Sequence, residues 1–246
     1  MLTSAAQFVR YSAMARDQVA RLLALPLDPD RDLPAVDRCK VYDLSVDLPA
    51  DMAVEPESGS VELLEAGDLQ VQTPGRSVKL APKHFPGLLP FISGVVYSEA
   101  EATLVEQAGK VSATSTGGEA VCPFTAQAAS PTLPRLLEVG SAAPSGRITL
   151  ARDRDLAVRW SLAEGTAEQA ADLVYLELRF ARGKKDVALR CRPRDDGSFE
   201  IPQAMLAEVT GHAVLELARL RRSLFTANGL DQGELRVTVR DSATIE

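Results

Sequence analysis

The side chains that could serve as nucleophiles, general bases or metal ligands are few and scattered. The chain of 246 residues contains two histidines, His84 and His212, and three cysteines, Cys39, Cys122 and Cys191. No Cys-x-x-Cys pair occurs, and the two histidines stand far apart in the sequence. Because a zinc site needs three or four such ligands at fixed spacing, we predict that the protein binds no metal.

No arrangement of Ser, Cys and His follows a catalytic pattern. Neither Gly59-Ser60 nor Gly197-Ser198 stands in the Gly-x-Ser-x-Gly turn that exposes a nucleophile. Cys122 could pair with a histidine as nucleophile and base. It precedes Pro123-Phe124 at the start of a predicted strand, however, which favours a buried structural thiol. We therefore predict that the protein is not an enzyme and has no catalytic residues.

Carboxylate pairs and glycines are better explained by turns than by a site. Asp153 with Asp155, and Asp195 with Asp196, could support acid–base catalysis. Carboxylates so close in sequence usually lie in a turn or point apart on a strand. Gly117-Gly118 lacks the strand–loop–helix pattern of a phosphate-binding loop, so we predict no cofactor. Whether a small-molecule ligand binds cannot be read from these residues.

The composition is that of a globular protein with few aromatic residues and a negative charge. Hydrophobic residues make up 46% of the chain, aromatic residues 5%, and the formal net charge is -7. Because unspecific nucleic-acid binding relies on Lys and Arg that neutralise phosphates, we predict no nucleic-acid partner. Arg219, Arg221, Arg222 and Arg240 concentrate positive charge near the C-terminus. We predict that they line the solvated face of a strand.

The sequence offers no signal that would direct the chain to a membrane. No apolar run approaches the length of a membrane-spanning helix, so no transmembrane segment is predicted. The N-terminus lacks a continuous apolar stretch and an Ala-x-Ala cleavage signal, which predicts a cytoplasmic protein. The odd number of cysteines allows one disulfide with a free thiol, or three reduced thiols.

The first 25 residues have a helical pattern of apolar and small side chains. These side chains recur at steps of three and four, which places them on one face of an amphipathic helix. Ser4 and Gln7 have the spacing of a capping box, and Pro26 would end the helix. We predict that this face docks on a protein partner or on a second copy of the chain. The predicted docking residues are Ala5, Phe8, Ser12, Ala15, Val19 and Leu22.

After a linker rich in Pro and Asp at 26–37, the pattern changes to two-residue alternation. Residues 41–48 alternate between two faces, which is typical of a half-buried strand. Short candidate strands follow, each bounded by Gly, Pro or Ser. They are predicted at 59–65, 68–73, 77–81, 91–97, 101–107, 110–116 and 123–129. Many short strands with regular turns indicate a sandwich or a barrel.

The clearest alternation lies in the last third of the chain. Leu156, Val158 and Trp160 share one face, so Trp160, the sole tryptophan, is predicted to lie in the core. Further apolar faces are formed by Val174, Leu176, Leu178 and Phe180, by Val187, Leu189 and Cys191, and by Leu235, Val237 and Val239. Their alternates, such as Tyr175 and Glu177, are predicted to point outward. Matched faces of this kind are what two packed antiparallel sheets require.

The predicted fold is mainly β, with two consecutive antiparallel β-sandwich domains after an N-terminal amphipathic helix. The helix and its linker occupy 1–37, the first sandwich-like domain 38–143, and an immunoglobulin-like sandwich 144–246. The boundary is placed in 141–146, which contains only small residues, Pro and Gly. One short helix is predicted inside the second sandwich, at 201–209, with Pro near its start.

The order of motifs between residues 104 and 240 resembles that of a known family. The motifs are Ala108-Gly109, Val111-Ser112-Ala113-Thr114, Gly117-Gly118, Pro123-Phe124, Pro131, Asp155-Leu156-Ala157-Val158-Arg159-Trp160, Leu189-Arg190-Cys191, Asp196-Gly197-Ser198-Phe199-Glu200-Ile201-Pro202, Arg219-Leu220-Arg221 and Glu234-Leu235-Arg236-Val237-Thr238-Val239. They are similar to a family of uncharacterised β-sandwich envelope proteins, many of them lipoproteins, of myxobacteria and related bacteria. The resemblance implies the cell envelope as the alternative location, and it carries over no catalytic residue.

Three functions remain open from the sequence. A structural or assembly subunit that binds a protein through its N-terminal helix is the preferred interpretation. An envelope module that binds carbohydrate or cell-wall material is the alternative, and it would need exposed aromatic residues, for which Tyr97 and Tyr175 are candidates. An enzyme without a recognisable motif comes third, and it would need perturbed titratable groups gathered in one pocket.

Overall fold

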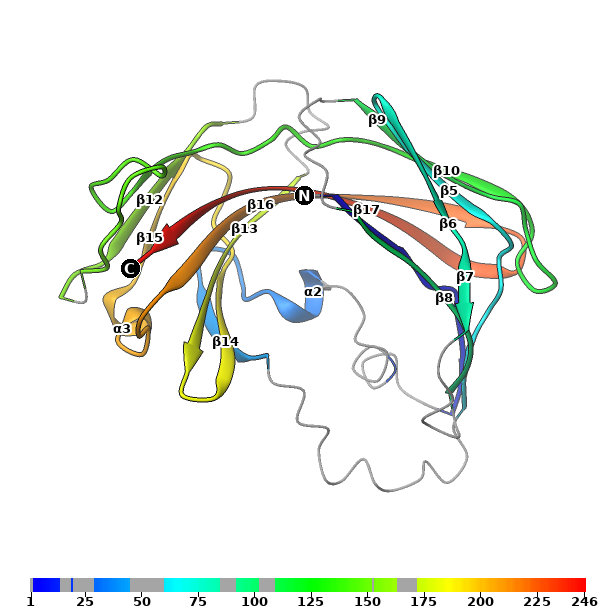
Figure 1. Cartoon of the computed structure of the whole chain (residues 1–246), viewed down its shortest axis with the longest axis horizontal. Coiled ribbons are helices and arrows are strands. Elements are labelled where there is room, and N and C mark those ends of the chain that lie inside the picture. The colour runs from blue at the N-terminus through cyan, green and yellow to red at the C-terminus, as the bar shows by residue number, and fades with distance from the viewer. Residues whose placement is uncertain are drawn as a thin grey trace. The chain divides into compact units, whose positions relative to one another are not determined.

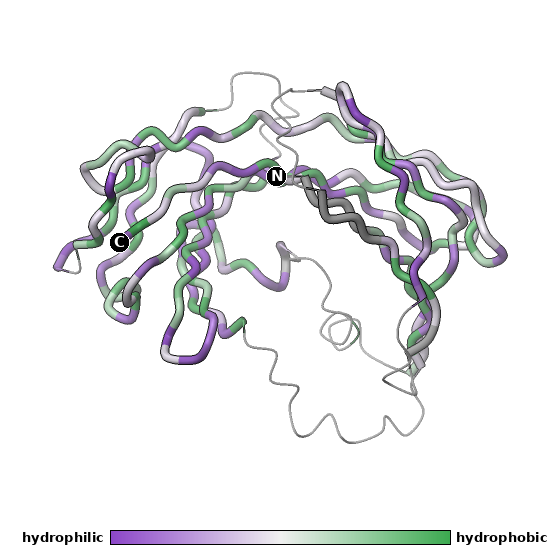
Figure 2. Tube along the Cα trace, viewed as in Figure 1, coloured by the Kyte–Doolittle hydropathy of each residue, from purple (hydrophilic) through white to green (hydrophobic). Residues whose placement is uncertain are grey.

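Strands dominate the part of the chain that the computed structural model describes (Figure 1). The described residues are 2–13, 19, 29–44, 60–84, 92–101, 109–151, 153–162 and 172–246. Figure 2 shows hydrophilic and hydrophobic residues following one another along many of these strands. The mainly β class predicted from two-residue alternation is therefore confirmed.

The chain divides into two compact units, and each unit collects three separate segments of the sequence. Unit 1 comprises Met1–Pro26, Leu48–Ser130 and Arg222–Val237, and unit 2 comprises Leu27–Asp47, Pro131–Arg221 and Thr238–Glu246. This division differs from the consecutive domains predicted at 38–143 and 144–246. In the segment where the boundary was placed, Val139 and Ala142 pair in an isolated bridge, so these small residues form a turn inside unit 2.

Unit 1 contains two sheets made of short strands. Its strands are β1 (Leu2–Ala6), β2 (Val9–Ser12), β4 (Ser60–Leu63), β5 (Leu69–Thr73), β6 (Arg76–Leu80), β7 (Pro82–His84), β8 (Ile92–Glu101), β9 (Lys110–Ser115) and β10 (Phe124–Ala129). One sheet has the order β1-β8-β4-β2, with β7 also paired to β8, and the other has the order β10-β9-β5-β6. The strands predicted at 59–65, 68–73, 77–81, 91–97, 110–116 and 123–129 are thereby confirmed. Most of the predicted strand 101–107 lies outside the described residues.

The core of unit 1 is organised around Phe8. The Phe8 ring meets the Tyr97 ring edge-on, with centroids 5.9 Å apart, and lies 5.7 Å from the Phe124 ring. Tyr97 is 1% exposed, and its hydroxyl oxygen accepts a hydrogen bond of 2.8 Å from the backbone N–H of Ala66. A buried tyrosine needs such a partner, because an unpaired polar group costs free energy in the core.

The N-terminal helix is a wrong prediction for residues 2–12, which form β1 and β2. Leu2–Ala6 pairs antiparallel with β8, and Val9–Ser12 pairs antiparallel with β4. Within these residues the helical spacing rested on Ala5, Phe8 and Ser12, of which only Phe8 has a large apolar area to bury. Pairing in two ladders satisfies the backbone groups of both segments and places Phe8 between them in the core, so tertiary contacts outweigh the weak local pattern.

Unit 2 consists of two antiparallel sheets that share one core. Its elements are α2 (Pro29–Asp32), β3 (Cys39–Asp43), β11 (Leu136–Val139), β12 (Leu156–Trp160), β13 (Leu173–Arg182), β14 (Lys185–Cys191), β15 (Ser198–Ile201) and α3 (Gln203–Leu206). The smaller sheet has the order β11-β12-β15. The larger one has the order β17-β16-β13-β14-β3. The long strands β16 (Ala213–Ala227) and β17 (Leu230–Ile245) also contribute residues to unit 1.

The core of unit 2 confirms three of the four apolar faces predicted after residue 150, whereas Leu235, Val237 and Val239 are half-buried and do not belong to it. Val158 and Trp160 of β12 are buried against Leu176, Leu178 and Leu189 of the larger sheet, and none of these five is more than 2% exposed. Such inward-facing residues from both sheets are what a β-sandwich core requires. The short helix predicted at 201–209 is present as α3, which contributes the buried side chain of Leu206.

Truncation of Phe8 tests whether this residue belongs to a core or to a docking helix. We expect Phe8→Ala to lower the free energy of unfolding by about 3–5 kcal/mol, because the substitution leaves a cavity among Tyr97 and Phe124. Urea denaturation measures the change, and Ser12→Ala on the exposed end of β2 serves as the control. A Phe8→Ala protein of unchanged stability that loses a binding partner would restore the helix interpretation.

Candidate functional site

The predicted docking residues differ in burial where the structure describes them, and Phe8 belongs to the core of unit 1. Ala5 lies in the β1–β8 ladder, and Ser12 is exposed at the end of β2. Val19 is helical but only 2% exposed, so its side chain is not available to a partner. Ala15 and Leu22 lie outside the described residues.

Charged side chains gather instead beneath a segment that crosses the second face of the larger sheet of unit 2. We call residues 29–44, which include α2 and β3, the strap. Leu33 of the strap packs on Tyr175 and Leu220, which lie on the face opposite the main core. This cover leaves Tyr175 and Glu177 each only 2% exposed. Both lie on the face opposite the main core, as predicted, but the strap excludes them from solvent.

Glu177 is the centre of this cluster. Arg190 stands directly opposite it on β14, and its Nε donates a hydrogen bond of 2.5 Å to Glu177 Oε2. Arg179, two residues along β13, donates from Nε to Glu177 Oε1. Arg190 Nη1 also reaches the backbone oxygen of Asp32, at 3.5 Å, so the same guanidinium contacts both the sheet and the strap.

The surroundings of Glu177 keep its carboxyl group ionised. Burial alone would raise the pKa of Glu177, because a charge is poorly solvated in the interior. The hydrogen bonds and positive charges of Arg190 and Arg179 outweigh burial and hold the pKa below its ordinary value. A carboxylate with both oxygens bound to guanidinium groups is a weak proton acceptor, so Glu177 is a poor general base.

A second pair of contacts extends the cluster toward β16 and β17. Arg240 donates from Nη2 to the Tyr175 hydroxyl at 3.4 Å, and its Nε lies 3.8 Å from Glu216 Oε2. Burial raises the pKa of Tyr175, although the Arg240 charge opposes it, so the phenol stays protonated at neutral pH. Burial would lower the pKa of Arg240, but Tyr175 and Glu216 outweigh it and raise that pKa.

A buried ion pair between Arg219 and Asp195 lies on the core side of the larger sheet. Arg219 is fully buried, and its Nε and Nη2 donate to the two carboxylate oxygens of Asp195 at 2.8 and 2.9 Å. Trp160 Nε1 donates to the same Asp195 at 2.8 Å, while Arg219 also reaches the backbone oxygen of Ser161. The prediction that Arg219 lies on a solvated face is therefore wrong. A buried charge needs partners, and Asp195 and the backbone oxygen of Ser161 supply them.

The other reactive residues singled out from the sequence occupy turns and surfaces. His84 and His212 are both exposed. Asp155 accepts a hydrogen bond from the backbone N–H of Gln203, the first residue of α3, and Asp196 accepts one from the backbone N–H of Ser198. These carboxylates therefore stabilise local backbone, as their predicted place in turns indicates.

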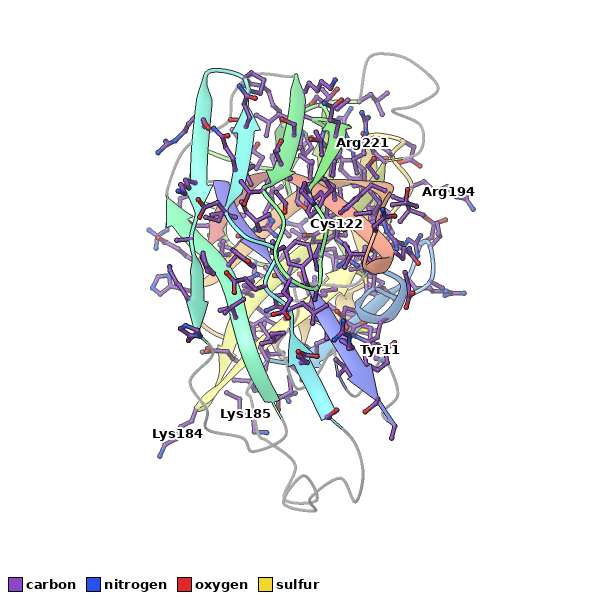
Figure 3. All side chains as sticks on the ribbon, turned by 90° about the vertical axis from the view of Figure 1, so that its right-hand side faces the viewer. Tyr11, Cys122, Lys184, Lys185, Arg194 and Arg221 are labelled. Atoms are coloured by element: carbon purple, nitrogen blue, oxygen red, sulfur yellow. A yellow bond between two sulfur atoms is a disulfide. The ribbon has the colours of Figure 1, made fainter. Side chains whose placement is uncertain are left out.

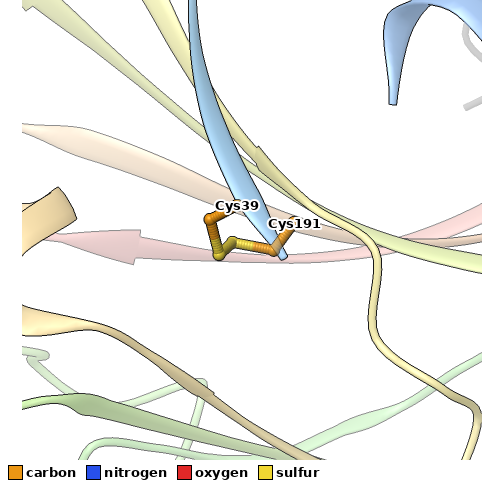
Figure 4. The surroundings of a disulfide bond; sticks show 2 residues. All are labelled: Cys39 and Cys191. Carbon is orange, nitrogen blue, oxygen red and sulfur yellow. A yellow bond between two sulfur atoms is a disulfide. The ribbon is translucent and has the colours of Figure 1, made fainter. Parts of the chain in front are cut away.

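Two of the three cysteines form a disulfide within the larger sheet (Figure 4). Cys39 of the strap stands directly opposite Cys191 on the neighbouring strand, with a Cα–Cα distance of 4.0 Å. Both side chains point to the main core, where Cys191 is fully buried. Cys122 is a free and exposed thiol in unit 1 (Figure 3), so the prediction that it is buried is wrong.

Comparisons with known proteins give no family for the chain. No protein-family model matches it, and no curated protein matches it. Within the described ranges, no group of three or more His, Cys, Asp or Glu side chains is placed to hold a metal ion. No helix in those ranges is long and apolar enough to cross a membrane.

Replacement of the central carboxylate tests the cluster through its pH dependence. We expect Glu177→Gln to lower the free energy of unfolding at pH 7 by about 3 kcal/mol, because two guanidinium groups lose a buried counter-charge. The folded pKa of Glu177 lies below its ordinary value of 4.5, so its stabilising effect is complete above that value and is lost as the pH falls through the folded pKa. Denaturant titrations between neutral and acid pH should therefore show the two proteins converging in acid.

The control for this comparison is Glu200→Gln, which removes an exposed carboxylate from β15. We expect it to change stability by less than about 0.5 kcal/mol at any pH. If the Glu177→Gln curve instead ran parallel to that of the unmodified protein down to low pH, the charge of Glu177 would have no part in the effect.

Proposed function

We propose that this protein is a non-enzymatic subunit that acts by binding a protein partner or another copy of itself. The proposal rests on the hydrogen bonds and ion pairs that join the charged side chains beneath the strap. Buried ionisable groups often mark catalytic sites, but Glu177 is bound to Arg190, which also contacts the strap, and Arg240 is paired with Glu216. They hold a folded surface together, which is the role expected of a structural or assembly component.

The immunoglobulin-like character of unit 2 belongs to the same proposal. Two antiparallel sheets around a core with a buried tryptophan support it. In such sandwiches, binding usually falls to surfaces and loops supported by a rigid scaffold, whatever the sequence of the core.

The alternative, a module that binds carbohydrate, loses its predicted aromatic contacts. Tyr97 and Tyr175 are 1% and 2% exposed, so neither ring can stack on a sugar. Trp160 is likewise buried, as predicted. We therefore favour protein binding over sugar binding.

The disulfide supports an oxidising compartment as the place where this subunit works. Structural disulfides persist in secreted and envelope proteins, whereas the cytosol keeps thiols reduced. The bond between Cys39 and Cys191 joins strands far apart in the sequence and ties the strap to the larger sheet. We propose the cell envelope in place of the cytoplasm.

Thiol counting tests the compartment. We expect protein isolated from its own cells, unfolded in the presence of N-ethylmaleimide without a reductant, to gain one adduct, on Cys122. After reduction the same protein should gain three adducts, which intact-mass spectrometry resolves. Three adducts before reduction would show that the bond is absent in the cell and would remove the support for an oxidising compartment.

Partner binding is tested on the full chain, purified under mild conditions from the cells that make it. We expect a native mass above that of one chain, from self-association or from a partner recovered in stoichiometric amount. Recombinant chain remixed with the recovered partner, or diluted in the case of self-association, should reproduce the assembly. A monomer that recovers no partner after cross-linking in cells would contradict the proposal.

A further inference from the structure

Basic residues frame the disulfide on both of its strands. Lys40 stands directly opposite Arg190, on one side of the cysteine pair. On the other side Arg192 donates its backbone N–H to the backbone oxygen of Arg38, at 3.1 Å. Because the two cysteines point into the core, strand alternation turns Lys40 and Arg190 to the opposite face, and Arg38 and Arg192 extend the two strands by one residue each. We call Arg38, Lys40, Arg190 and Arg192 the basic patch.

The patch carries positive charge that the described residues do not neutralise. Only Arg190 has a carboxylate partner, the buried Glu177. No described carboxylate pairs with the side chains of Arg38, Lys40 or Arg192, and the first two residues are exposed. Like charges directly opposite each other destabilise a sheet, so this arrangement works against folding.

An aromatic ring and a further guanidinium border the patch. The Tyr42 ring lies between two cations, with Arg190 Cζ 4.9 Å and Lys40 Nζ 5.3 Å from its centroid. Arg194, just beyond Arg192, is paired with Asp37 and points away from the ribbon (Figure 3). The patch also lies at an edge, because β3 is the outer strand in the described order of its sheet.

We propose that the basic patch binds an extended acidic segment of a partner protein. Residues two apart on a strand are spaced by about 6.8 Å, so Arg38 and Lys40 match the spacing of alternate carboxylates in an extended peptide. Arg192 adds a cation beside Arg38, whereas the Arg190 side chain is only 12% exposed and stays bound to Glu177. The alternation of charge therefore fits Asp or Glu at every second position, and the Tyr42 ring offers an apolar contact beside them. The proposal rests on the proposed function and names the chemistry of its partner.

A narrow peptide fits the patch better than an anionic membrane surface. The patch is two strands wide, while the chain as a whole carries a net charge of -7. A flat anionic surface would bring that excess negative charge close to its own. A peptide engages only the charges within about one Debye length, roughly 10 Å at 0.1 M salt, so the distant negative charge opposes it little.

The test compares two variants of equal charge change by fluorescence anisotropy. One is Arg38→Gln/Lys40→Gln/Arg192→Gln, and the control is Lys79→Gln/Arg147→Gln/Arg159→Gln, which removes three cations that are 65–80% exposed and paired with carboxylates. The probe is a labelled peptide in which glutamate alternates with threonine, and a second peptide holds the same residues with the glutamates in one block.

We expect the alternating peptide to bind the unmodified protein and the control alike. The patch variant should bind it at least about tenfold more weakly, and raising the salt should weaken binding to the unmodified protein. The block peptide should bind less well than the alternating one. The patch variant should be at least as resistant to urea as the unmodified protein, because repulsion is relieved, so a lost interaction is not a folding failure.

Three outcomes would overturn the proposal. They are equal binding by both triple variants, equal binding of both peptides, and binding of phosphatidylglycerol vesicles in place of the peptide. If a partner recovered from cells stays bound to the patch variant, the patch proposal fails while the proposed function stands. If no partner is recovered and the chain is monomeric, the proposed function itself fails.

Discussion

The rest of unit 2 depends on the burial of β13 and β14 on both of their faces. Leu176, Leu178 and Leu189 fill the main core on one side, while the strap covers Tyr175 and Glu177 on the other. Charged side chains on a sheet face that contacts water need no counter-charge. On a face that another segment covers, they must be paired. The guanidinium groups around Glu177 follow from this constraint, and so does the bond that keeps the strap in place.

Two-residue alternation predicted the strands and the inward face of unit 2, because that pattern follows directly from strand geometry. It placed Trp160 correctly in the core. It could not tell whether the outward face meets water or another segment, since both satisfy the same period. The burial of Tyr175 and Glu177 was missed for this reason. The segment that covers them lies far away in the sequence. No local signal marks a residue as covered by a distant strap.

The remaining errors share a cause in long-range pairing. The spacing of Ala5, Phe8 and Ser12 fits a helix, yet the ladders with β4 and β8 and the burial of Phe8 decide the structure. The partner of Cys39 depends on strand register across a separation of 152 residues, which spacing alone cannot supply. Each of the two units is built from three segments, whereas the predicted boundary at 141–146 assumed consecutive domains.

The disulfide stands between two pairs of basic residues at the edge of its sheet. Lys40 opposite Arg190, and Arg38 beside Arg192, would push the outer strand β3 away from β14. The bond between them closes a loop of about 150 residues, which removes roughly 5 kcal/mol of unfolded-state entropy in the chain-entropy model. That contribution exceeds the cost of two exposed like-charge pairs, each on the order of 1 kcal/mol or less. The disulfide between the two basic pairs therefore keeps the edge strand β3 in its sheet, although Arg38 and Lys40 have no described carboxylate partner there.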